Sequence, residues 1–321
     1  MTQSSGRLSK EHLFDVYAKN LELVKRNKQV KLKGERTEGY VCPVCNKIFG
    51  KDALSTIYGD HLTLEHIPPE KLGGDVKLLT CKICNNEQGS KLDKDLKEKL
   101  LMDDFLSGIP HAGRPARFLT NGKWNTGGKI FNSESGGFEL RAVKDNSHHK
   151  HYHRLFKKGD LDVKKINITI YGQYKKRRPE IALLRIAYLW LYSEFGFASL
   201  INPNIAAVRQ QILNPDQTII KHIGQIQSDY PDEFEGVNII TKPHALKAFA
   251  VAFRTKTEHK ERKHIVLLPG PTEPGLNIYD HLNEASKDGK KINLNLTKLN
   301  LEGVLSEPNR VFEYQDVWFN T

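Results

Sequence analysis

The sequence contains little sulfur and no long hydrophobic run. Only four of its 321 residues are cysteine and two are methionine. No stretch reaches the roughly 18 uninterrupted apolar residues of a membrane-spanning helix, because the longest candidate, residues 181–197, contains Arg185 and Glu194. The opening residues, MTQSSGRLSKEH, lack the apolar core of a secretory signal. We therefore expect a cytoplasmic protein that has no membrane partner.

Positive charge is in excess. Lysine and arginine number 49, and aspartate plus glutamate 38, which gives a net charge of +11. Hydrophobic residues make up 38% and charged residues 27%, so the chain can bury a core and is not expected to be disordered as a whole. Its 321 residues suit two domains of about 150 residues each. A basic protein without a membrane partner most simply binds nucleic acid.

The four cysteines form two pairs with the same spacing, Cys42 with Cys45 and Cys81 with Cys84. Disulfides are disfavoured in a reducing cytosol. Two C-x2-C pairs instead supply four thiolates on tight turns, which suits a closed tetrahedral zinc site. The alternative is four unconnected buried thiols, which behave as small hydrophobic residues. The matched spacing favours structural Zn²⁺ bound by all four cysteines.

The segment between the pairs predicts two strands and a helix. Residues 62–66 favour a strand, which the two prolines after Ile67 end because proline cannot donate to a β-ladder. A double glycine then permits a tight turn, and residues 76–80 favour a second strand. The second cysteine pair leads directly into a helix, for which Asn85 or Asn86 is a natural N-cap.

This segment resembles the HNH endonucleases, also called His-Me finger or ββα-metal nucleases. The resemblance is to the branch in which paired cysteines clamp the finger and an asparagine closes the motif. It covers residues 41–96, about a sixth of the chain. The features that carry it occur in the family's order: Glu65-His66, Pro68-Pro69, Gly73-Gly74 and Cys81-x-x-Cys84-Asn85.

The resemblance implies a metal-dependent endonuclease that hydrolyses phosphodiester bonds in duplex DNA, leaving a 5′-phosphate and a 3′-hydroxyl. It implies that His66 is the general base, and that Glu65 and Asn85 hold one Mg²⁺ or Mn²⁺ ion. The family's middle asparagine, which steadies the loop that carries the histidine, is replaced here by Asp75 or Val76. We expect the loss of this asparagine to lower catalytic efficiency more than to change the class of reaction.

The pair Glu65-His66 raises a geometric requirement. Adjacent side chains on a regular strand point to opposite faces of the sheet. Glu65 and His66 can therefore share a target only if the strand ends or bends there, which the two following prolines make plausible. Side chains on opposite faces would contradict the assignment.

Together these features predict an α+β protein with a zinc-stapled ββα-metal HNH finger near the N-terminus and a mixed α+β C-terminal domain. We expect a basic helical arm at residues 1–40, the finger at 41–106, a Gly-rich and then basic connector at 107–178, and an α+β domain of unassigned role at 179–321. The connector's Gly-rich part, residues 108–137, predicts loops joining short strands. Outside the finger's core we expect helices at 91–105, 179–195, 205–213 and 244–253, and strands at 163–170 and 264–268.

Residues 141–178 carry most of the net charge, with twelve Lys/Arg against three Asp/Glu. Long cationic side chains in the run Lys175, Lys176, Arg177 and Arg178 suit contacts with DNA phosphates, although a solvated turn explains them equally well. The histidines at 148, 149, 151 and 153 are more simply a basic surface than a metal site.

Two other functions use part of the same pattern. A non-catalytic zinc-ribbon protein that binds nucleic acid needs the cysteines and the basic surface, but not Glu65, His66 or Asn85. A degenerate nuclease kept as a binding module is compatible with the missing middle asparagine. Restriction, defence and mobile-element roles all remain open.

Overall fold

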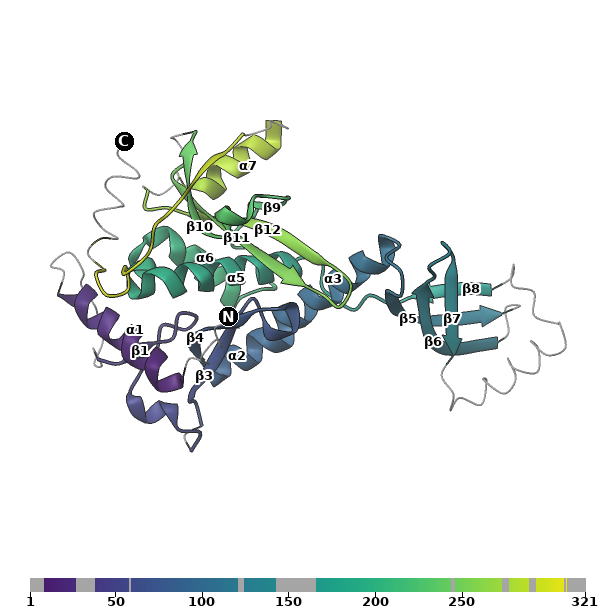
Figure 1. The fold of residues 1–321 in the computed structure, drawn as a ribbon, viewed down its shortest axis with the longest axis horizontal. Helices are drawn as coiled ribbons and strands as arrows, with labels where there is room; N and C mark the ends of the chain where they lie inside the picture. The colour runs from purple at the N-terminus through teal and green to yellow at the C-terminus, as the bar shows by residue number, and fades with distance from the viewer. Residues whose placement is uncertain are drawn as a thin grey trace, which may run out of the picture. The chain divides into compact units, whose positions relative to one another are not determined.

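The computed structural model describes most of the chain (Figure 1). The described residues are 9–26, 38–57, 59–120, 124–142, 166–243, 246–272, 277–288, 293–308 and 310. Their helices and antiparallel sheets confirm a mixed α+β fold. The chain divides into two compact units: the first is Met1–Lys94, Lys176–Lys256 and Glu261–Thr321, and the second is Asp95–Lys175 with Thr257–Lys260. The cysteine-bearing finger and most of residues 179–321 thus share one unit.

The first unit contains a five-stranded antiparallel sheet. In the order β13-β10-β11-β12-β9, its strands are Asn295–Lys298, Gly236–Lys242, Ala248–Lys256, Glu261–Pro269 and Gln225–Gln227. Strand β11 is central, and its first six residues are all buried. The helix predicted over residues 244–253 is therefore wrong for its described part from residue 248 onward. Burial in the middle of the sheet overrides the helix preference of the alternating alanines. The strand predicted at 264–268 is confirmed within β12.

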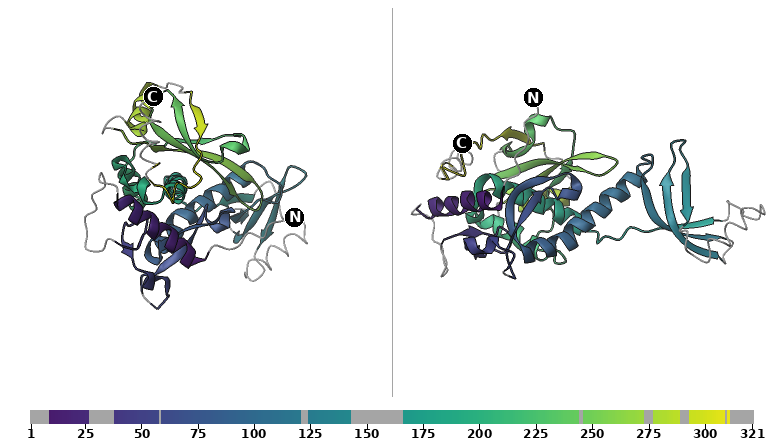
Figure 2. Two further views of the ribbon diagram at one scale, coloured as in Figure 1. Left: turned by 60° about the vertical axis from the view of Figure 1, so that its left-hand side comes forward. Right: turned by 60° about the horizontal axis from the view of Figure 1, so that its bottom comes forward.

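Helix α5, Arg178–Phe195, forms the core of this unit and lies along the five-stranded sheet (Figure 1, Figure 2). Pro179 lies in its first turn, as predicted. The ring of Trp190 stacks on that of Phe253 in β11, with 6.2 Å between centroids. The span Arg178–Ile201 is long and apolar enough to cross a membrane, but 78% of its apolar window is buried inside the protein. It therefore behaves as a core helix.

The first unit also contains helices α1 Lys10–Lys25, α6 Pro203–Leu213 and α7 Ile278–Asp288. The predicted helices near the N-terminus and at 205–213 are thus confirmed. In α1, Leu13, Tyr17 and Leu21 lie on the buried side, which follows their helical spacing. The Tyr17 hydroxyl donates to the Ser193 carbonyl of α5 at 3.0 Å, so α1 is anchored to the core helix.

The finger packs against α5 as well. Its elements are β1 Tyr40–Val41, β2 Ile48–Phe49, β3 Leu62–Ile67, β4 Asp75–Cys81 and α2 Lys82–Gln88. The predicted order of strand, loop, strand and helix is present in β3, β4 and α2, with β3 and β4 antiparallel. The Tyr192 hydroxyl of α5 donates to the Val41 carbonyl at 2.9 Å, and the Tyr188 hydroxyl donates to that of Pro43. Helix α5 therefore holds the first cysteine-bearing hairpin.

The second unit combines helix α3, Lys94–Leu106, from Asp95 onward, with a four-stranded antiparallel sheet. In the order β7-β6-β5-β8, the strands are Phe138–Ala142, Trp124–Asn132, Gly113–Thr120 and Ile166–Ile170. Strands β5 and β6 have eight and nine residues, so the prediction of loops and short strands is wrong here. Glycines are tolerated within them because ladder hydrogen bonds use only the backbone. The helix predicted at 91–105 is confirmed in α3, and the strand predicted at 163–170 is confirmed in β8 for residues 166–170. Residues 163–165 and the histidines at 148–153 lie outside the described residues.

Candidate functional site

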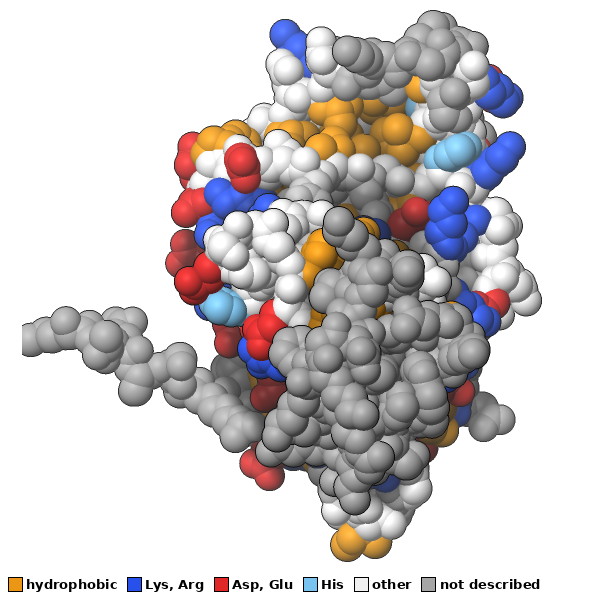
Figure 3. Space-filling view, turned by 90° about the vertical axis from the view of Figure 1, so that its right-hand side faces the viewer, with side chains coloured by type: hydrophobic (Ala, Val, Ile, Leu, Met, Phe, Trp, Pro, Cys, Tyr) orange, Lys and Arg blue, Asp and Glu red, His pale blue; other side chains and the backbone are white. Residues whose placement is uncertain are grey.

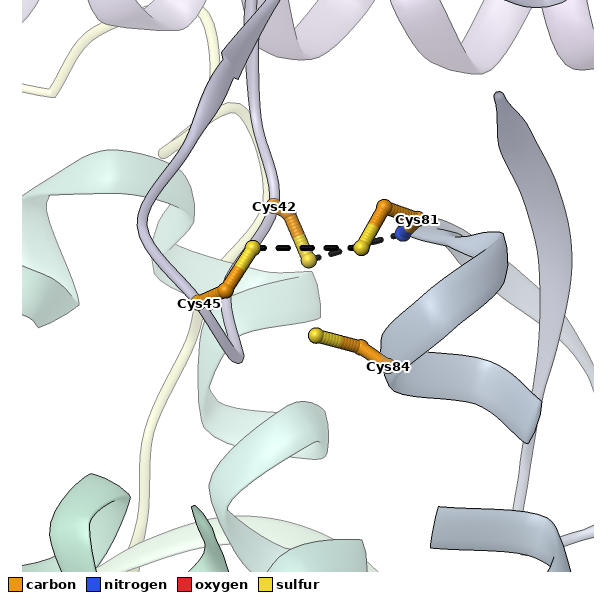
Figure 4. Close-up of side chains that lie close together, drawn as sticks. All are labelled: Cys42, Cys45, Cys81 and Cys84. Atoms are coloured by element: carbon orange, nitrogen blue, oxygen red, sulfur yellow. Dashed lines mark hydrogen bonds between the residues drawn. The ribbon is translucent and has the colours of Figure 1, made fainter. Parts of the chain in front are cut away.

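The first cysteine pair lies on the turn between β1 and β2. The Cys42 amide donates to the Lys47 carbonyl at 2.9 Å, and the Asn46 amide donates to the Cys42 carbonyl at 2.9 Å. Asn46 has a φ of 60°, a left-handed conformation that asparagine tolerates better than most residues. The turn brings the sulfurs of Cys42 and Cys45 close to the second pair (Figure 4).

The second pair lies where β4 ends and α2 begins. Cys81 is the N-cap residue of α2, and Cys84 lies in its first turn. The Cys81 amide donates to Sγ of Cys42 at 3.5 Å, and the sulfurs of Cys45 and Cys81 are 3.8 Å apart (Figure 4). All four sulfurs lie within 4.8 Å of one another. The structure therefore brings together the four cysteines whose spacing predicted a cluster.

This cluster can hold one metal ion such as zinc. Four thiolates about 2.3 Å from a tetrahedral ion lie about 3.8 Å from each other, which matches the separation of Cys45 and Cys81. Hydrogen bonds with Cys42 and Cys45 raise the pKa of the Cys81 and Cys84 thiols. A divalent cation would replace these protons and remove the repulsion between thiolates. All the sulfurs but that of Cys45 belong to buried residues, which suits a closed structural site.

The hairpin is irregular at Glu65 and His66. Glu65 pairs with Leu78 and His66 with Val76, so Lys77 is an extra residue in β4. Glu65 is 3% exposed, whereas His66 is only half-buried. The two neighbours in sequence therefore lie in different environments.

Helix α5 holds the Glu65 carboxylate inside the protein. Nη2 of Arg185 donates to Oε1 at 2.7 Å, and the Thr80 hydroxyl donates to Oε2 at 2.8 Å. Arg185 is 1% exposed, and its Nη1 donates to Oδ1 of Asp93 at 3.1 Å. Burial raises the pKa of Asp93 to about 6, although the Arg185 charge opposes the shift. Two carboxylates thus share one buried guanidinium.

Sequence reasoning predicted the helix at 179–195 but missed this charged cluster. A signal was present: Arg185 interrupts the apolar run of the helix, and a buried arginine needs a counter-charge. The identity of the partners was not readable, since Glu65 and Asp93 lie 120 and 92 positions earlier in the chain.

Asn85 ties α2 to β3. Its Nδ2 donates to the Thr63 hydroxyl at 2.9 Å and to the Leu64 carbonyl at 3.2 Å. The prediction that Asn85 or Asn86 caps the helix is wrong. Strand β4 runs directly into α2, and the N-cap position falls on Cys81.

The divalent-ion site predicted at Glu65 and Asn85 does not fit this arrangement. Both carboxylate oxygens of Glu65 are engaged, and the side chain is enclosed. An Mg²⁺ or Mn²⁺ ion at Glu65 would have to displace the Arg185 guanidinium from this carboxylate. A buried charge that loses its partner destabilises a protein by about 3–5 kcal/mol.

His66 is available for chemistry. Among the residues that the structure describes, its imidazole has no hydrogen-bond or ion-pair partner. It lies near the end of β3, on the irregular part of the hairpin. Histidine is the side chain best suited to proton transfer near neutral pH.

Part of the predicted DNA-binding run pairs within the protein. Lys175 and Lys176 are exposed. Arg178 makes two hydrogen bonds to the Asp216 carboxylate, at 2.9 and 2.8 Å, and Arg177 donates to the Thr218 hydroxyl at 2.8 Å. Among the residues drawn in colour, acidic and basic side chains both lie on the face shown in Figure 3.

Comparison with known proteins adds no relative: no family model, no curated protein and no solved structure matches this chain. The chemistry of the site therefore follows from its own side chains. These are a cysteine cluster that can hold a metal ion, a free and half-buried histidine, and an internally neutralised glutamate.

Proposed function

We propose that this protein is an HNH-type endonuclease that hydrolyses phosphodiester bonds in duplex DNA, with His66 as the general base. The observation that carries the proposal is the free, half-buried imidazole near the end of β3, in a hairpin followed by a helix. The imidazole takes a proton from water, whose oxygen attacks phosphorus. The bond from phosphorus to the 3′ oxygen breaks, and the leaving oxygen takes a proton from solvent. The products are a 5′-phosphate and a 3′-hydroxyl.

Zinc at the four cysteines would have a structural role. The cluster joins the β1–β2 turn to the start of α2, so one ion would fix the helix against the hairpin. Thiolate ligation also agrees with a cytoplasmic location, where thiols stay reduced. Mg²⁺ or Mn²⁺ would supply charge relief at the phosphate, but Glu65 does not serve as its ligand in the arrangement described.

A second candidate is a degenerate nuclease that binds nucleic acid without cutting it. The enclosed ion pair of Glu65 and Arg185 favours this candidate, because it occupies the acidic residue that the HNH resemblance assigns to the metal. Such a protein keeps the cysteine clamp and has no use for a free His66.

Cleavage of supercoiled plasmid in Mg²⁺ separates the two candidates. Wild type and the His66→Ala variant are compared at equal zinc content, with His12→Ala as a control, because His12 is an exposed histidine on α1. We expect wild type and the control to nick the plasmid, and loss of the base to reduce the rate by about 100-fold or more. Equal cleavage by His66→Ala would refute the assigned base. Retardation of the plasmid without cleavage by any variant would establish the second candidate.

A further inference from the structure

One face of the four-stranded sheet packs into the hydrophobic core of the second unit. Ala116, Phe118 and Ile130 are buried there and pack with Phe105 of α3. Because successive side chains alternate between the two faces of a strand, the residues between them belong to the opposite, outer face. The outer-face residues used below are exposed or half-buried: Arg117, Gly127, Lys129, Phe131, Glu139, Arg141, Thr169 and Tyr171.

Three cations are neighbours on this outer face. Lys129 in β6 is paired directly with Arg141 in β7. Arg117 in β5 is paired with Gly127, which places it diagonally next to Lys129. Like charges directly opposite each other on a sheet destabilise it. The fold therefore tolerates a concentration of positive charge that its own stability does not require.

These cations are oriented but little neutralised. Among the described residues, neither Arg117 nor Lys129 makes an ion pair. The guanidinium of Arg117 lies 5.8 Å from the centre of the Tyr171 ring. That of Arg141 lies 4.4 Å from the centre of Phe131 and also pairs with Glu139, an exposed contact of small energetic weight. Aromatic rings thus restrict the arginines without cancelling their charge.

The middle of this outer face carries a glycine, Gly127, which has no side chain. Among the residues that the structure describes, no atom lies within 4 Å of a side-chain carbon built on Gly127. Thr169, which pairs with Arg117 from the other side in β8, is exposed and offers a hydroxyl donor. A phosphodiester backbone can therefore approach the sheet between the cationic side chains.

We propose that this basic sheet face, formed by Arg117, Gly127, Lys129, Arg141 and Thr169, binds the phosphate backbone of DNA. The inference deepens the proposed endonuclease function and rests on it for the identity of the polyanion. Phosphate oxygens satisfy exposed arginine and lysine donors and relieve their mutual repulsion. An anionic membrane is less suited, because the exposed apolar residues Phe138 and Leu140 alternate onto the opposite face of β7.

Fluorescence anisotropy with a labelled DNA duplex tests the proposal in EDTA, so that no cleavage is needed. The double variant Arg117→Gln/Lys129→Gln removes two charges from the face. A control, Lys19→Gln/Lys221→Gln, removes two exposed charges elsewhere. Losing two phosphate contacts should lower the magnitude of the slope of log affinity against log salt by about 2, and weaken binding about tenfold near physiological salt. The control should keep the wild-type slope.

Equal affinities and slopes in wild type and the double variant would overturn the proposal, as would equal losses in the double variant and the control. Binding to vesicles with an anionic lipid fraction, without binding to DNA, would also overturn it. Unchanged thermal unfolding and zinc content of the double variant show that its fold is intact. If His66→Ala still cleaves while the double variant loses affinity, the assigned base fails and the basic sheet face stands.

Discussion

The finger and the basic sheet face use charge in opposite ways. Where the finger meets α5, Glu65 and Arg185 are buried, Asp93 is half-buried, and the guanidinium pairs with both carboxylates. On the sheet, Arg117 and Lys129 are exposed and make no ion pair within the described part of the chain. A buried charge depends on its partner for stability, whereas an exposed charge contributes little and stays free for a ligand. The first arrangement holds structure together, and the second is suited to recognition.

The largest expected effect comes from the cysteine cluster. Cys81→Ser removes one of four ligands, and zinc binding to such a site is worth about 10 kcal/mol or more of folding free energy. We expect loss of zinc, measured by atomic absorption, and loss of the cooperative thermal transition of the first unit. Arg117→Gln on the sheet should leave both unchanged. Full zinc content in Cys81→Ser would contradict a four-cysteine site.

Removing the buried guanidinium should come next. Arg185→Met leaves the buried Glu65 and the half-buried Asp93 without their counter-charge, so we expect about 3–5 kcal/mol of destabilisation in urea unfolding. Arg178→Met, in the same helix, breaks a pair whose partner Asp216 is largely exposed and should cost at most about 1 kcal/mol.

Adding Glu65→Gln and Asp93→Asn to Arg185→Met should recover part of the lost stability, because no charge is then buried. Equal decreases in the free energy of unfolding for Arg185→Met and Arg178→Met would show that burial does not determine how much these ion pairs contribute to stability.

The pH dependence of stability should report Asp93. Its pKa is raised from 3.8 to about 6, so the folded protein holds this proton more tightly than the unfolded chain. The resulting stabilisation is fully present below about pH 4 and is lost as pH rises through 6, a change of about 3 kcal/mol. The free energy of unfolding of wild type relative to Asp93→Asn should therefore fall between these pH values. If the difference in free energy of unfolding between wild type and Asp93→Asn stayed constant over this pH range, the pKa of Asp93 would not be raised by folding.

The smallest effect should appear on the sheet, with opposite signs for stability and binding. Lys129→Glu places an acid opposite Arg141 and should stabilise the protein by about 0.5 kcal/mol. The same change should weaken DNA binding, because it removes a cation and adds an anion to the basic sheet face. Lys221→Glu, an exposed change elsewhere, should leave both quantities nearly unchanged. A lower free energy of unfolding in Lys129→Glu than in wild type would contradict the claim that Lys129 and Arg141 repel each other across the paired strands.

Local patterns predicted much of the finger. The cysteine spacing anticipated the cluster, and the prolines and the double glycine anticipated the ends of β3 and the turn before β4. The same reasoning failed at β11, where an alanine-rich segment is a central strand. It failed again at β5 and β6, where glycines lie inside long strands. In these strands, pairing with distant segments outweighs local preference.

The charged cluster could not be predicted, because its partners meet only in the folded chain. Arg185 reaches the finger from a helix that begins more than 80 residues after the second cysteine pair. The outer face of the sheet was equally unreadable, since the proximity of Lys129 and Arg141 follows from strand register. Sequence charge identified residues 141–178 as the basic region, whereas Arg117 and Lys129 lie before it in the chain.

Single-turnover cleavage of a labelled DNA duplex over a range of protein concentrations tests the central claim most directly. The account predicts that His66→Ala loses the maximal rate and keeps its half-saturating concentration. Arg117→Gln/Lys129→Gln should show the reverse, with an unchanged maximal rate reached at higher protein concentration. A His66→Ala variant that cleaves at the wild-type maximal rate would contradict the assignment of chemistry to the finger.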